Sequence, residues 1–327
     1  MLYIETTSKD AAFHFSVEEY VMGFKQPVMM IWQADKCAMI GNYQIAEAEV
    51  DMAFAKQNNI QIVRRSSGGG TIYTDLGTIL LSQIMPMQEE KYVLPIVPAL
   101  NKMGVPAKLE GRNDITVEGK KVSGLAQYAK YGRMCSHGSL LYDTDLDMLT
   151  RILRVDTEKI TSKAIKSVRS RVTNIKEHMV MENRPVNTSG FLAQLKLELF
   201  RLQKTNSQKI SEYKLSEDDL KQINQIYKKR YGSTAWTFER APKFTFHNSK
   251  RFTGGKVEVY IDIVKGVAAS CKIRGDFLGT NPITDLEGLL EGQIFKYENF
   301  KNSLSGQILQ PYLGSITADE LLSCIFE

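Results

Sequence analysis

Short apolar runs separated by turn-forming residues dominate the first ninety positions, and this is the pattern of buried β-strands. The run TIYTDLGTILLSQI, residues 71–84, is rich in β-branched residues and is interrupted at Asp75-Leu76-Gly77. It therefore predicts two strands joined by a turn. Residues 47–58 carry Val50 and Phe54 among alanines and predict a helix. The other predicted strands are 28–32 and 37–41, on either side of a turn at 34–36, and 61–65.

The middle of the chain combines a hairpin with several helices. Residues 115–126, ITVEGKKVSGLA, predict a hairpin with Glu118-Gly119-Lys120 at its tip. Residues 138–153, GSLLYDTDLDMLTRIL, pass from a strand into an amphipathic helix. Ser216 followed by Asp219 resembles a helix-capping signal. Further helices are predicted over residues 94–103, 188–203 and 216–231.

The pattern changes after Arg240-Ala241-Pro242, and residues 256–273 alternate between apolar and polar side chains. A turn at Lys265-Gly266 predicts a hairpin there, followed by a helix near 286–290 and another from Thr317. These elements predict a separate small α+β unit whose boundary lies near residues 242–250. The residues expected on the buried face of the hairpin are Val257, Val259, Ile261, Ile263, Val267, Ala269, Cys271 and Ile273.

Composition narrows the class of protein. The chain has 327 residues, of which 43% are hydrophobic and 24% charged, as in globular domains. Four scattered cysteines without a CxxC pair argue against disulfides or zinc. No apolar run reaches about 18 residues and no secretory signal is visible, so we expect a cytoplasmic protein without a membrane partner. A net charge of +5 suits phosphate-bearing ligands or an acidic partner, and is too small to indicate nucleic-acid binding.

The most unusual stretch is Arg64–Thr71, RRSSGGGT. Three successive glycines let a backbone approach a ligand closely and turn its amide groups toward it. The adjacent arginines supply donors for phosphate or carboxylate. The stretch has neither the GK[ST] ending of a P-loop nor a GxGxxG, and a strand follows it, so neither of those phosphate sites is predicted. A flexible turn beside surface arginines remains an equal alternative.

A second cluster comprises residues 111–114 (GRND) and 119–124 (GKKVSG). Lys121 stands where a strand leaves a tight turn, so its ammonium can meet a negative charge in a pocket. Such a cation would stabilise charge that grows on a phosphorus or a carboxylate in a transition state. Because lysines are mostly exposed, two solvated turn lysines are the stronger interpretation if this cluster is taken alone.

Several motifs in the right order resemble those of the lipoate–protein ligase A family, in the biotin/lipoate protein ligase superfamily. The family pattern RRxSGGGxVxHDxGN is similar to residues 64–78, and GRNDxxxxGxKxSGxA matches residues 111–126 at every fixed position. HHGTLL resembles residues 136–141, SHGSLL, and KGIxSVRSRVTN resembles residues 163–174, KAIKSVRSRVTN. The stretch RFTGGKVEVYIDIVKG, from Arg251, resembles the start of the family's C-terminal accessory domain.

The resemblance implies an α+β fold, with a large mixed-sheet catalytic domain of the biotin/lipoate ligase type over residues 1–245 and a small α+β accessory domain over 246–327. It also implies an ATP-dependent lipoate–protein ligase. Lipoate would attack the α-phosphate of ATP, with Mg²⁺ present, to give lipoyl-adenylate and pyrophosphate. A lysine of an acceptor protein, either an E2 lipoyl domain or a glycine-cleavage H-like protein, would then expel AMP.

Roles for individual residues follow from motif position. Lys121 would bridge the phosphate and the lipoyl carbonyl, and Arg65 would contact the adenylate phosphate. Asp114 would position Lys121 or magnesium, and His137 is the one histidine expected to act in the site. No set of protein metal ligands is predicted. The residues expected around the nucleotide are Gly68, Gly69, Gly70, Thr71, Ile72 and Tyr73.

Departures from the family pattern leave two alternatives open. Thr74, Thr78 and Ser136 stand where the family usually has His, Asn and the first His of HHGT, which motivates a non-catalytic binding protein that kept the fold. The other alternative is an ATP-independent lipoyl or octanoyl transferase. Such relatives carry a cysteine upstream of the GxK motif, where this chain has residues 108–111, and Cys135 is not expected to replace it.

A basic run lies in the region of the SVRSRVTN motif. A solvated helix face is one interpretation. Docking of an acidic acceptor domain, or closure over nucleotide phosphates, is the other, and the two have equal support. The run comprises Lys159, Lys163, Lys166, Arg169, Arg171 and Lys176.

Overall fold

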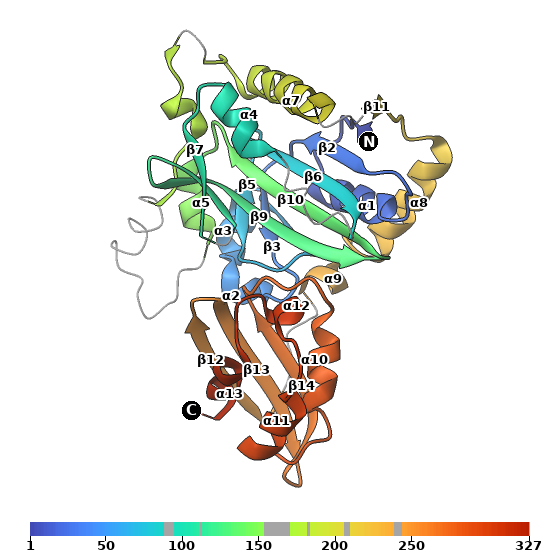
Figure 1. The fold of residues 1–327 in the computed structure, drawn as a ribbon, viewed down its shortest axis with the longest axis vertical. Helices are drawn as coiled ribbons and strands as arrows, with labels where there is room; N and C mark the ends of the chain where they lie inside the picture. Colours follow the sequence, from blue (N-terminus) through green and yellow to red (C-terminus); the bar gives the residue numbers. More distant parts are fainter. Residues whose placement is uncertain are drawn as a thin grey trace.

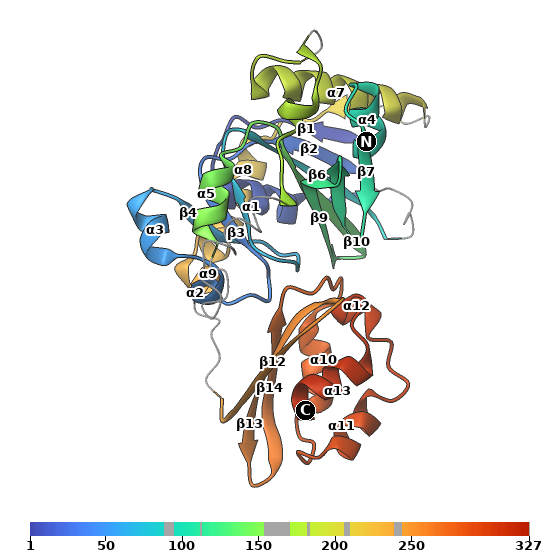
Figure 2. The ribbon, with the colours of Figure 1, turned by 90° about the vertical axis from the view of Figure 1, so that its left-hand side faces the viewer.

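The computed structural model describes residues 1–87, 95–111, 113–153, 171–181, 184–205, 210–238 and 244–326. Figure 1 and Figure 2 show two parts, a large α+β unit and, at one end of it, a smaller α+β unit built by the end of the chain. This arrangement confirms the predicted fold class. Arg112 and most of the basic run, from Lys159 to Arg169, lie outside the described residues.

An eight-stranded mixed sheet is the centre of the large unit. Its strand order is β11-β1-β2-β6-β10-β9-β8-β7; β1 is parallel to β2 and β11, and the remaining pairs are antiparallel. The predicted hairpin is confirmed as β8 and β9. The strands are β1 (Leu2–Ile4), β2 (Val28–Trp32), β6 (Thr78–Pro86), β7 (Ala107–Glu110), β8 (Asp114–Val117), β9 (Lys120–Lys130), β10 (Arg133–Leu141) and β11 (Ser211–Glu212).

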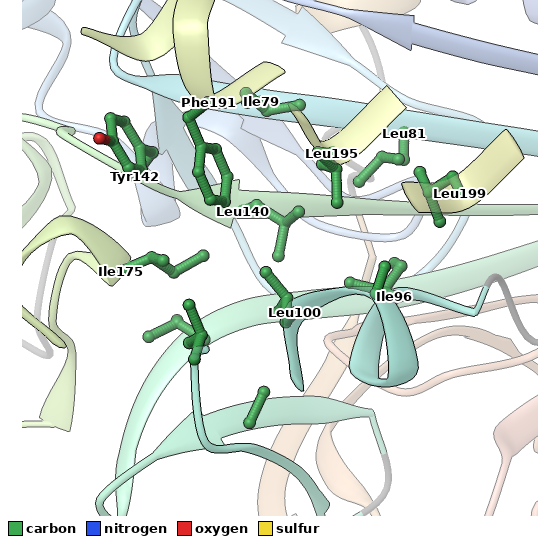
Figure 3. Packing of buried hydrophobic residues seen from close by; sticks show 14 of the residues in the cluster. Ile79, Leu81, Ile96, Leu100, Leu140, Tyr142, Ile175, Phe191, Leu195 and Leu199 are labelled. Atoms are coloured by element: carbon green, nitrogen blue, oxygen red, sulfur yellow. The ribbon is translucent and has the colours of Figure 1, made fainter. Parts of the chain in front are cut away.

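Both faces of this sheet are covered, which explains why all five residues of β2 are buried. Met29 and Ile31 join the core beneath α4 (Ile96–Lys102) and α7 (Thr188–Thr205). Figure 3 shows other members of this core, among them Leu100 of α4 and Leu195 of α7. The alternate residues of β2 face α1 (Ala11–Val21) and α8 (Glu217–Lys229) on the other side. A continuous apolar strand is therefore the signature of a central strand between two helical layers. The predicted helices in these regions are confirmed.

A second sheet, of order β4-β3-β5, packs beside α1. The turns at 34–36 and 75–77 carry the chain from one sheet to the other, so the strands on either side of each turn do not pair with each other. The strands are β3 (Cys37–Ile40), β4 (Gln61–Arg64) and β5 (Ile72–Thr74), and α5 (Leu146–Ile152) and the 3-10 helix η2 (Ile175–His178) lie elsewhere in the large unit.

The single helix predicted over residues 47–58 is wrong in detail, because the chain forms two short helices there, α2 (Ala46–Glu49) and α3 (Met52–Gln57). Val50 leaves the helix in an extended conformation and forms an isolated bridge with Leu153. Asp51 then caps α3 by accepting the Phe54 N–H at 2.9 Å. A tertiary contact thus overrides the local helical preference.

The small unit is a three-stranded antiparallel sheet covered by helices on one side (Figure 2). The predicted hairpin at Lys265-Gly266 is confirmed, but Ala269 is exposed and Ala268 is buried. A bulge between Asp262 and Ile263 shifts the register by one residue and so reverses which alanine faces the core. The elements are β12 (Phe246–Phe252), β13 (Gly255–Val264), β14 (Val267–Gly275), α10 (Ile283–Leu290), α11 (Tyr297–Leu304), α12 (Gln310–Leu313) and α13 (Ala318–Phe326), with α9 (Thr234–Phe238) preceding them.

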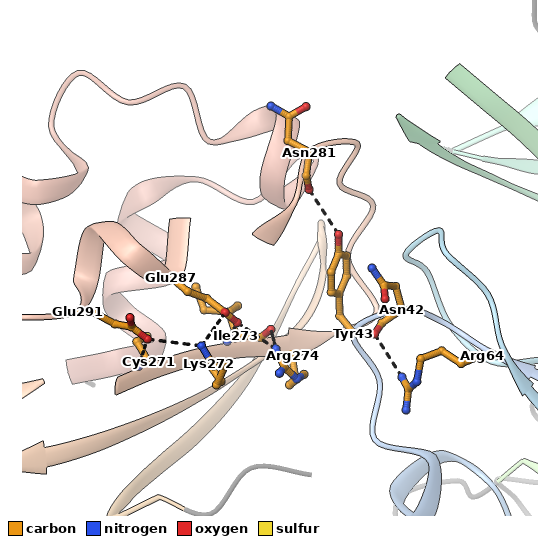
Figure 4. Close-up of polar contacts among 10 residues, drawn as sticks. All are labelled: Asn42, Tyr43, Arg64, Cys271, Lys272, Ile273, Arg274, Asn281, Glu287 and Glu291. Atoms are coloured by element: carbon orange, nitrogen blue, oxygen red, sulfur yellow. Dashed lines mark hydrogen bonds and ion pairs between the residues drawn. The ribbon is translucent and has the colours of Figure 1, made fainter. Parts of the chain in front are cut away.

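A buried carboxylate links β14 to α10, as Figure 4 shows. Glu287 is 1% exposed; it accepts the Ile273 N–H at 2.8 Å and pairs with Arg274 at 3.0 Å and Lys272 at 3.1 Å. Because every oxygen has partners, the charge is stabilised where it is buried.

None of the helices in the described part of the chain combines the length and the apolar character needed to cross a bilayer.

Candidate active site

The glycine stretch forms a loop between β4 and β5, and its backbone lies close to the backbone at Gly41. A Cβ on Gly41 would lie 2.1 Å from the Gly69 carbonyl oxygen, so neither segment could hold this position with a larger residue. Gly69 has φ of +87°, a conformation that glycine adopts at no steric cost. The Asn42 N–H donates to the Ser67 carbonyl at 2.8 Å and closes the approach.

Both arginines of the loop are buried, so the alternative of a flexible turn beside surface arginines is wrong. Arg65 donates to the carbonyls of Met39 and Gly70, each at 2.7 Å, and of Gly68 at 2.8 Å. Burial lowers the pKa of Arg65 to about 10, which leaves it charged at neutral pH. Arg64 donates to Gly41 at 2.9 Å and Thr237 at 2.7 Å. The two guanidinium groups therefore hold the loop in one shape.

Lys121 lies near the start of β9 and forms an ion pair with Asp114 of β8 at 2.7 Å. Its Nζ passes over the backbone of Gly124, where a Cβ would be 3.3 Å away. Its carbonyl accepts the Thr173 N–H at 3.0 Å, so the end of the SVRSRVTN motif lies against it. The fully solvated alternative is therefore wrong for Lys121, whereas Lys120 is exposed.

The glycine loop and Lys121 line the same cavity, of about 140 Å³. Its lining combines apolar side chains with glycines, polar side chains and two cations. The apolar lining is Phe15, Trp32, Met39, Ile72, Leu80, Leu81, Leu125 and Ala126. The polar and glycine lining is Arg65, Gly69, Gly70, Thr71, Asn113, Lys121, Gly124, His137, Gly138 and Ser139.

Seven of the ten residues predicted for the site line this cavity, and three do not. Gly68 is packed against the small unit, where a Cβ would be 2.4 Å from the Phe277 carbonyl oxygen. Tyr73 is buried in a separate core with Ile40 and the residues of α5. Asp114 faces an open hollow that it shares with Lys121, Gly119 and Arg171. The seven are Arg65, Gly69, Gly70, Thr71, Ile72, Lys121 and His137.

His137 forms a buried cluster with Glu18 and Cys135, whose candidate ligand atoms all lie within 4.8 Å of one another. Both imidazole nitrogens already have partners, Ser67 at 2.6 Å and Glu18 at 3.2 Å. Burial raises the pKa of the Cys135 thiol well above its usual value, which keeps the thiol protonated. The cluster therefore suits a hydrogen-bonded core better than a metal site, since a metal needs free imidazole and thiolate ligands.

The small unit completes the outer side of the site. The Gly69 N–H donates to the Phe277 carbonyl at 3.1 Å, and the Ala129 N–H donates to Thr280 at 3.2 Å. Tyr43 stacks on Phe277 with ring centroids 5.0 Å apart and points toward Asn281 (Figure 4). A second hollow lies between β9, β10 and residues 278–280, and it shares Asn113, Leu125, Ala126 and His137 with the cavity.

The departures from the family pattern fall outside the cavity. Thr74 is fully buried in β5, and the Thr78 hydroxyl lies 2.8 Å from that of Thr144. Ser136 accepts from Gln127 at 2.8 Å and lines the second hollow. None of these three side chains lines the cavity.

Apart from Ile72, the apolar lining of the cavity escaped sequence reasoning, and so did two polar residues behind it, Glu18 and Ser67. These side chains come from strands and helices far apart along the chain, so no local spacing marks them. Trp32, an aromatic residue at the end of a wholly buried strand, was the one visible signal. Ser67 lies inside the glycine stretch, but its burial at 0% exposure comes from tertiary packing.

A cavity lined by apolar side chains, a lysine, an arginine and a glycine-rich loop is suited to a small carboxylic acid with an apolar tail beside a phosphate group. Residues 10–200 match the family described as lipoyl protein ligase A/B catalytic domain, and residues 241–325 match the bacterial lipoate protein ligase C-terminus. The chain belongs to the lipoate–protein ligase family.

Individual relatives match this chain over its full length. The chain is 35% identical to lipoate-protein ligase LplJ of Bacillus subtilis, covering 100% of both chains, and 34% identical to a lipoate–protein ligase of Streptococcus pyogenes, covering 97% and 96%. Among solved structures, LipL1 of P. falciparum in complex with lipoate has a TM-score of 0.78 at 22% identity, covering 98% of both chains. A bipartite ligase of Thermoplasma acidophilum has a TM-score of 0.64 at 25% identity, covering 75% and 98%.

Proposed function

We propose that this chain is an ATP-dependent lipoate–protein ligase. Lipoate and ATP give lipoyl-adenylate and pyrophosphate, and the lipoyl group then passes to a lysine of an acceptor protein. The observation that carries the proposal is the cavity, because apolar side chains, Lys121 and the glycine loop line it together. The bacterial relatives that match this chain over its whole length are named lipoate ligases.

The cavity separates the two chemical parts of lipoate. The aliphatic chain and the ring would lie among Trp32, Met39 and Leu80, where each buried CH₂ contributes about 0.8 kcal/mol. The carboxylate would remain at the mouth, because burying a charge without a partner is costly. This orientation would bring the acid oxygen to the side of the loop where we place the α-phosphate.

Lys121 would act as the cation between the two reacting groups. In the first step the carboxylate oxygen bonds to the α-phosphorus, and the bond to pyrophosphate breaks while negative charge accumulates. In the second step the acceptor amine attacks the carbonyl carbon and loses a proton, and the bond to AMP breaks. An ammonium near both centres stabilises each transition state. The ion pair with Asp114 would hold that ammonium in place.

Neither step needs a protein nucleophile, and this distinguishes the proposal from a cysteine-dependent transferase. Cys135 lies behind the cavity at 0% exposure with a protonated thiol. Leu109 and Glu110, in the stretch where such transferases carry their cysteine, lie at the edge strand β7.

Magnesium would accompany the ATP phosphates. The carboxylates of Asp114 and Glu110 line the hollow beside Lys121, and a protein usually holds Mg²⁺ with one or two carboxylates and the substrate phosphates. These two residues therefore fit the ion. Arg171, from the basic run, lines the same hollow, which favours its action on phosphates over a purely solvated role.

We propose an E2 lipoyl domain or a glycine-cleavage H-like protein as the acceptor. Support comes from the Thermoplasma acidophilum relative, whose structure is described together with its E2 lipoyl domain. We also propose a domain division into residues 1–245 and 246–327, because β12 begins the separate sheet at Phe246.

The decisive experiment is lipoate-dependent exchange of pyrophosphate into ATP by the full chain. We expect Lys121→Ala to lower kcat/KM by about 10²- to 10³-fold, the usual effect of removing one preorganised donor. Lys120→Ala is the matched control, since Lys120 is the exposed neighbour on the same strand. It should stay within about threefold of the wild type, and circular dichroism should show both variants folded.

The outcomes separate the possible functions. Exchange by the wild type, followed by a mass gain on an acceptor domain, supports a ligase. A mass gain from an acylated donor protein without ATP would instead support a transferase. Normal exchange by folded Lys121→Ala would remove this residue from the mechanism while leaving the ligase activity established.

A further inference from the structure

A directional chain of hydrogen bonds runs behind the cavity from its apolar wall to its glycine loop. Trp32 Nε1 donates to Ser82 Oγ at 3.0 Å, and the Ser82 hydroxyl donates to Glu18. At the other end, Arg65 Nε donates to Ser67 Oγ at 3.1 Å. His137 joins the two halves, because one ring nitrogen lies beside Ser67 and the other beside Glu18. Trp32 and Arg65 line the cavity, whereas the carboxylate and the two hydroxyls lie behind it.

The donors at the two ends and the carboxylate between them favour one placement of the protons. An indole N–H and a guanidinium Nε–H can only donate, so each serine accepts from that end and keeps its own hydrogen available for its other partner. The Glu18 carboxylate can only accept, so His137 Nδ1, which lies 3.2 Å from both of its oxygens, carries the imidazole proton. His137 Nε2 is then the acceptor for the Ser67 hydroxyl at 2.6 Å. In this arrangement every polar hydrogen of the hydrogen-bond series from Trp32 to Arg65 has a partner.

Burial makes other arrangements of these hydrogen bonds costly. Glu18 is 1% exposed, Ser67 and Ser82 are 0% exposed, and His137 is 8% exposed. Water has little access to these groups, so a reversed donor leaves a buried polar atom without a partner, and that is costly. Burial thus favours one arrangement of the network.

We propose that Glu18 is a positioning residue of the ligase, which through His137 sets the acyl wall and the glycine loop in one mutual geometry. The inference rests on the proposed function, because Trp32 would contact the lipoyl tail and Arg65 holds the loop that would bind the phosphate. A small displacement of either end would misalign the carboxylate and the α-phosphorus, and adenylation depends on that alignment.

The first test is the tautomer of His137, measured by ¹⁵N NMR of histidine-labelled full chain. Only four histidines are present, and a His137→Asn spectrum assigns the signal. We expect the Nδ1–H form in the wild type. In Glu18→Gln the side-chain amide can donate to Nδ1, so the signal should move toward the Nε2–H form. A wild-type Nε2–H tautomer, or no change in Glu18→Gln, would overturn the proposal without bearing on ligase activity.

The second test measures whether a substitution at Glu18 changes kcat or KM in pyrophosphate exchange. Glu18→Gln should lower kcat by about 10- to 100-fold, because a misplacement of about 1 Å at the reacting atoms can cost about 10²-fold, with less than about threefold change in the KM for lipoate. Glu18→Asp keeps the acceptor charge and should recover part of kcat. Glu19→Gln is the matched control, because Glu19 is the next carboxylate on α1 and pairs with Lys130 and Arg230 instead.

Equal loss in Glu18→Gln and Glu19→Gln would contradict a specific role, as would a change in KM alone. If Glu18→Gln does not fold, Ser82→Ala provides the same test, since it cuts the link to Trp32 and leaves the carboxylate. It should keep the Nδ1–H tautomer and lose kcat, and an unchanged kcat would refute the coupling. Failure of the wild type to exchange pyrophosphate would reject the proposed function, while the tautomer measurement would still decide the network.

Discussion

His14 shows how one residue can be fully committed to the fold without taking part in the chemistry. Its ring is 0% exposed and stacks on Trp32 with centroids 4.2 Å apart. Its nitrogens lie 3.3 Å from the Thr6 hydroxyl and 2.9 Å from the Ser8 carbonyl. Burial lowers the pKa of His14 to about 4, because the cation loses its hydration, so the ring stays neutral at physiological pH.

This residue should make stability depend on pH. In the unfolded chain its pKa returns to about 6.5, so between the two values the unfolded state binds more protons and is favoured. The contribution is complete above about pH 6.5 and is lost as the pH falls toward 4, by about 3 kcal/mol in total. We expect His14→Asn to remove this part of the pH dependence, measured as the urea-unfolding free energy at pH 7 and 4.5.

The control for this prediction is His247→Asn, because the His247 side chain is 48% exposed. It should keep the wild-type difference between the two pH values. The same pH dependence in His14→Asn as in the wild type would mean that other groups cause it.

Helix caps and tight turns in the structure agree closely with those that the local sequence predicts. Ser216 and Asp219 form the predicted capping box of α8, and the Thr317 hydroxyl accepts the Glu320 N–H at 3.2 Å. Glu118 and Gly119 both have positive φ at the tip of the β8–β9 hairpin, as a tight two-residue turn requires. Caps and turns are decided within a few residues, so the sequence predicts them.

Helix α10 contains an exposed glycine, which lowers helix stability and can be replaced. Gly288 lies in the second half of α10, is exposed, has no positive φ, and an added Cβ would meet no atom within 4 Å. We expect Gly288→Ala to stabilise the small unit by about 0.4–1 kcal/mol, because alanine restricts the unfolded chain more than glycine does. The measurement is the midpoint of urea unfolding.

Gly314→Ala provides the opposite control. Gly314 has φ of +65°, and a Cβ there would lie 2.6 Å from the Leu278 carbonyl oxygen. This variant should lose stability where Gly288→Ala gains it. A loss in both would show that α10 does not tolerate the extra methyl group.

At the scale of the whole molecule, the small unit is part of the site and not an appendage. Tyr43 belongs to the large unit by sequence but is buried in the core of the small unit, stacked on Phe277. The Gly275 N–H donates to the Tyr43 carbonyl at 3.1 Å, and the Phe277 carbonyl accepts from Gly69. The glycine loop is therefore supported from both units.

This contact predicts that Phe277→Ala disturbs the loop across the interface. We expect faster amide hydrogen exchange at residues 68–71, because the variant removes the stacking partner of Tyr43 and loosens the backbone that accepts the Gly69 N–H. Phe300→Ala is the control, since Phe300 is fully buried in the same small unit but packs near Phe295 and Phe326. Each should cost about 3–5 kcal/mol in the small unit.

Only Phe277→Ala should change exchange at the glycine loop. If Phe300→Ala produced the same change, general loosening of the small unit would explain it, and the direct contact would not be needed.

The sequence by itself determined the strands, most helices, the two units and the position of Arg65 and Lys121 in conspicuous motifs, because periodicity, turns and contiguous motifs are local properties. It could not determine the break at Val50 or the register beyond Asp262, since a distant bridge and a bulge decide them.

Only the tertiary structure decided which side chains form the cavity, that Arg65 holds its own loop, and that Glu18 reaches His137 across 119 positions of chain. Each of these depends on which segments lie side by side. Sheet order and the docking of the small unit fix those neighbours, and neither is written in the spacing of residues along the chain.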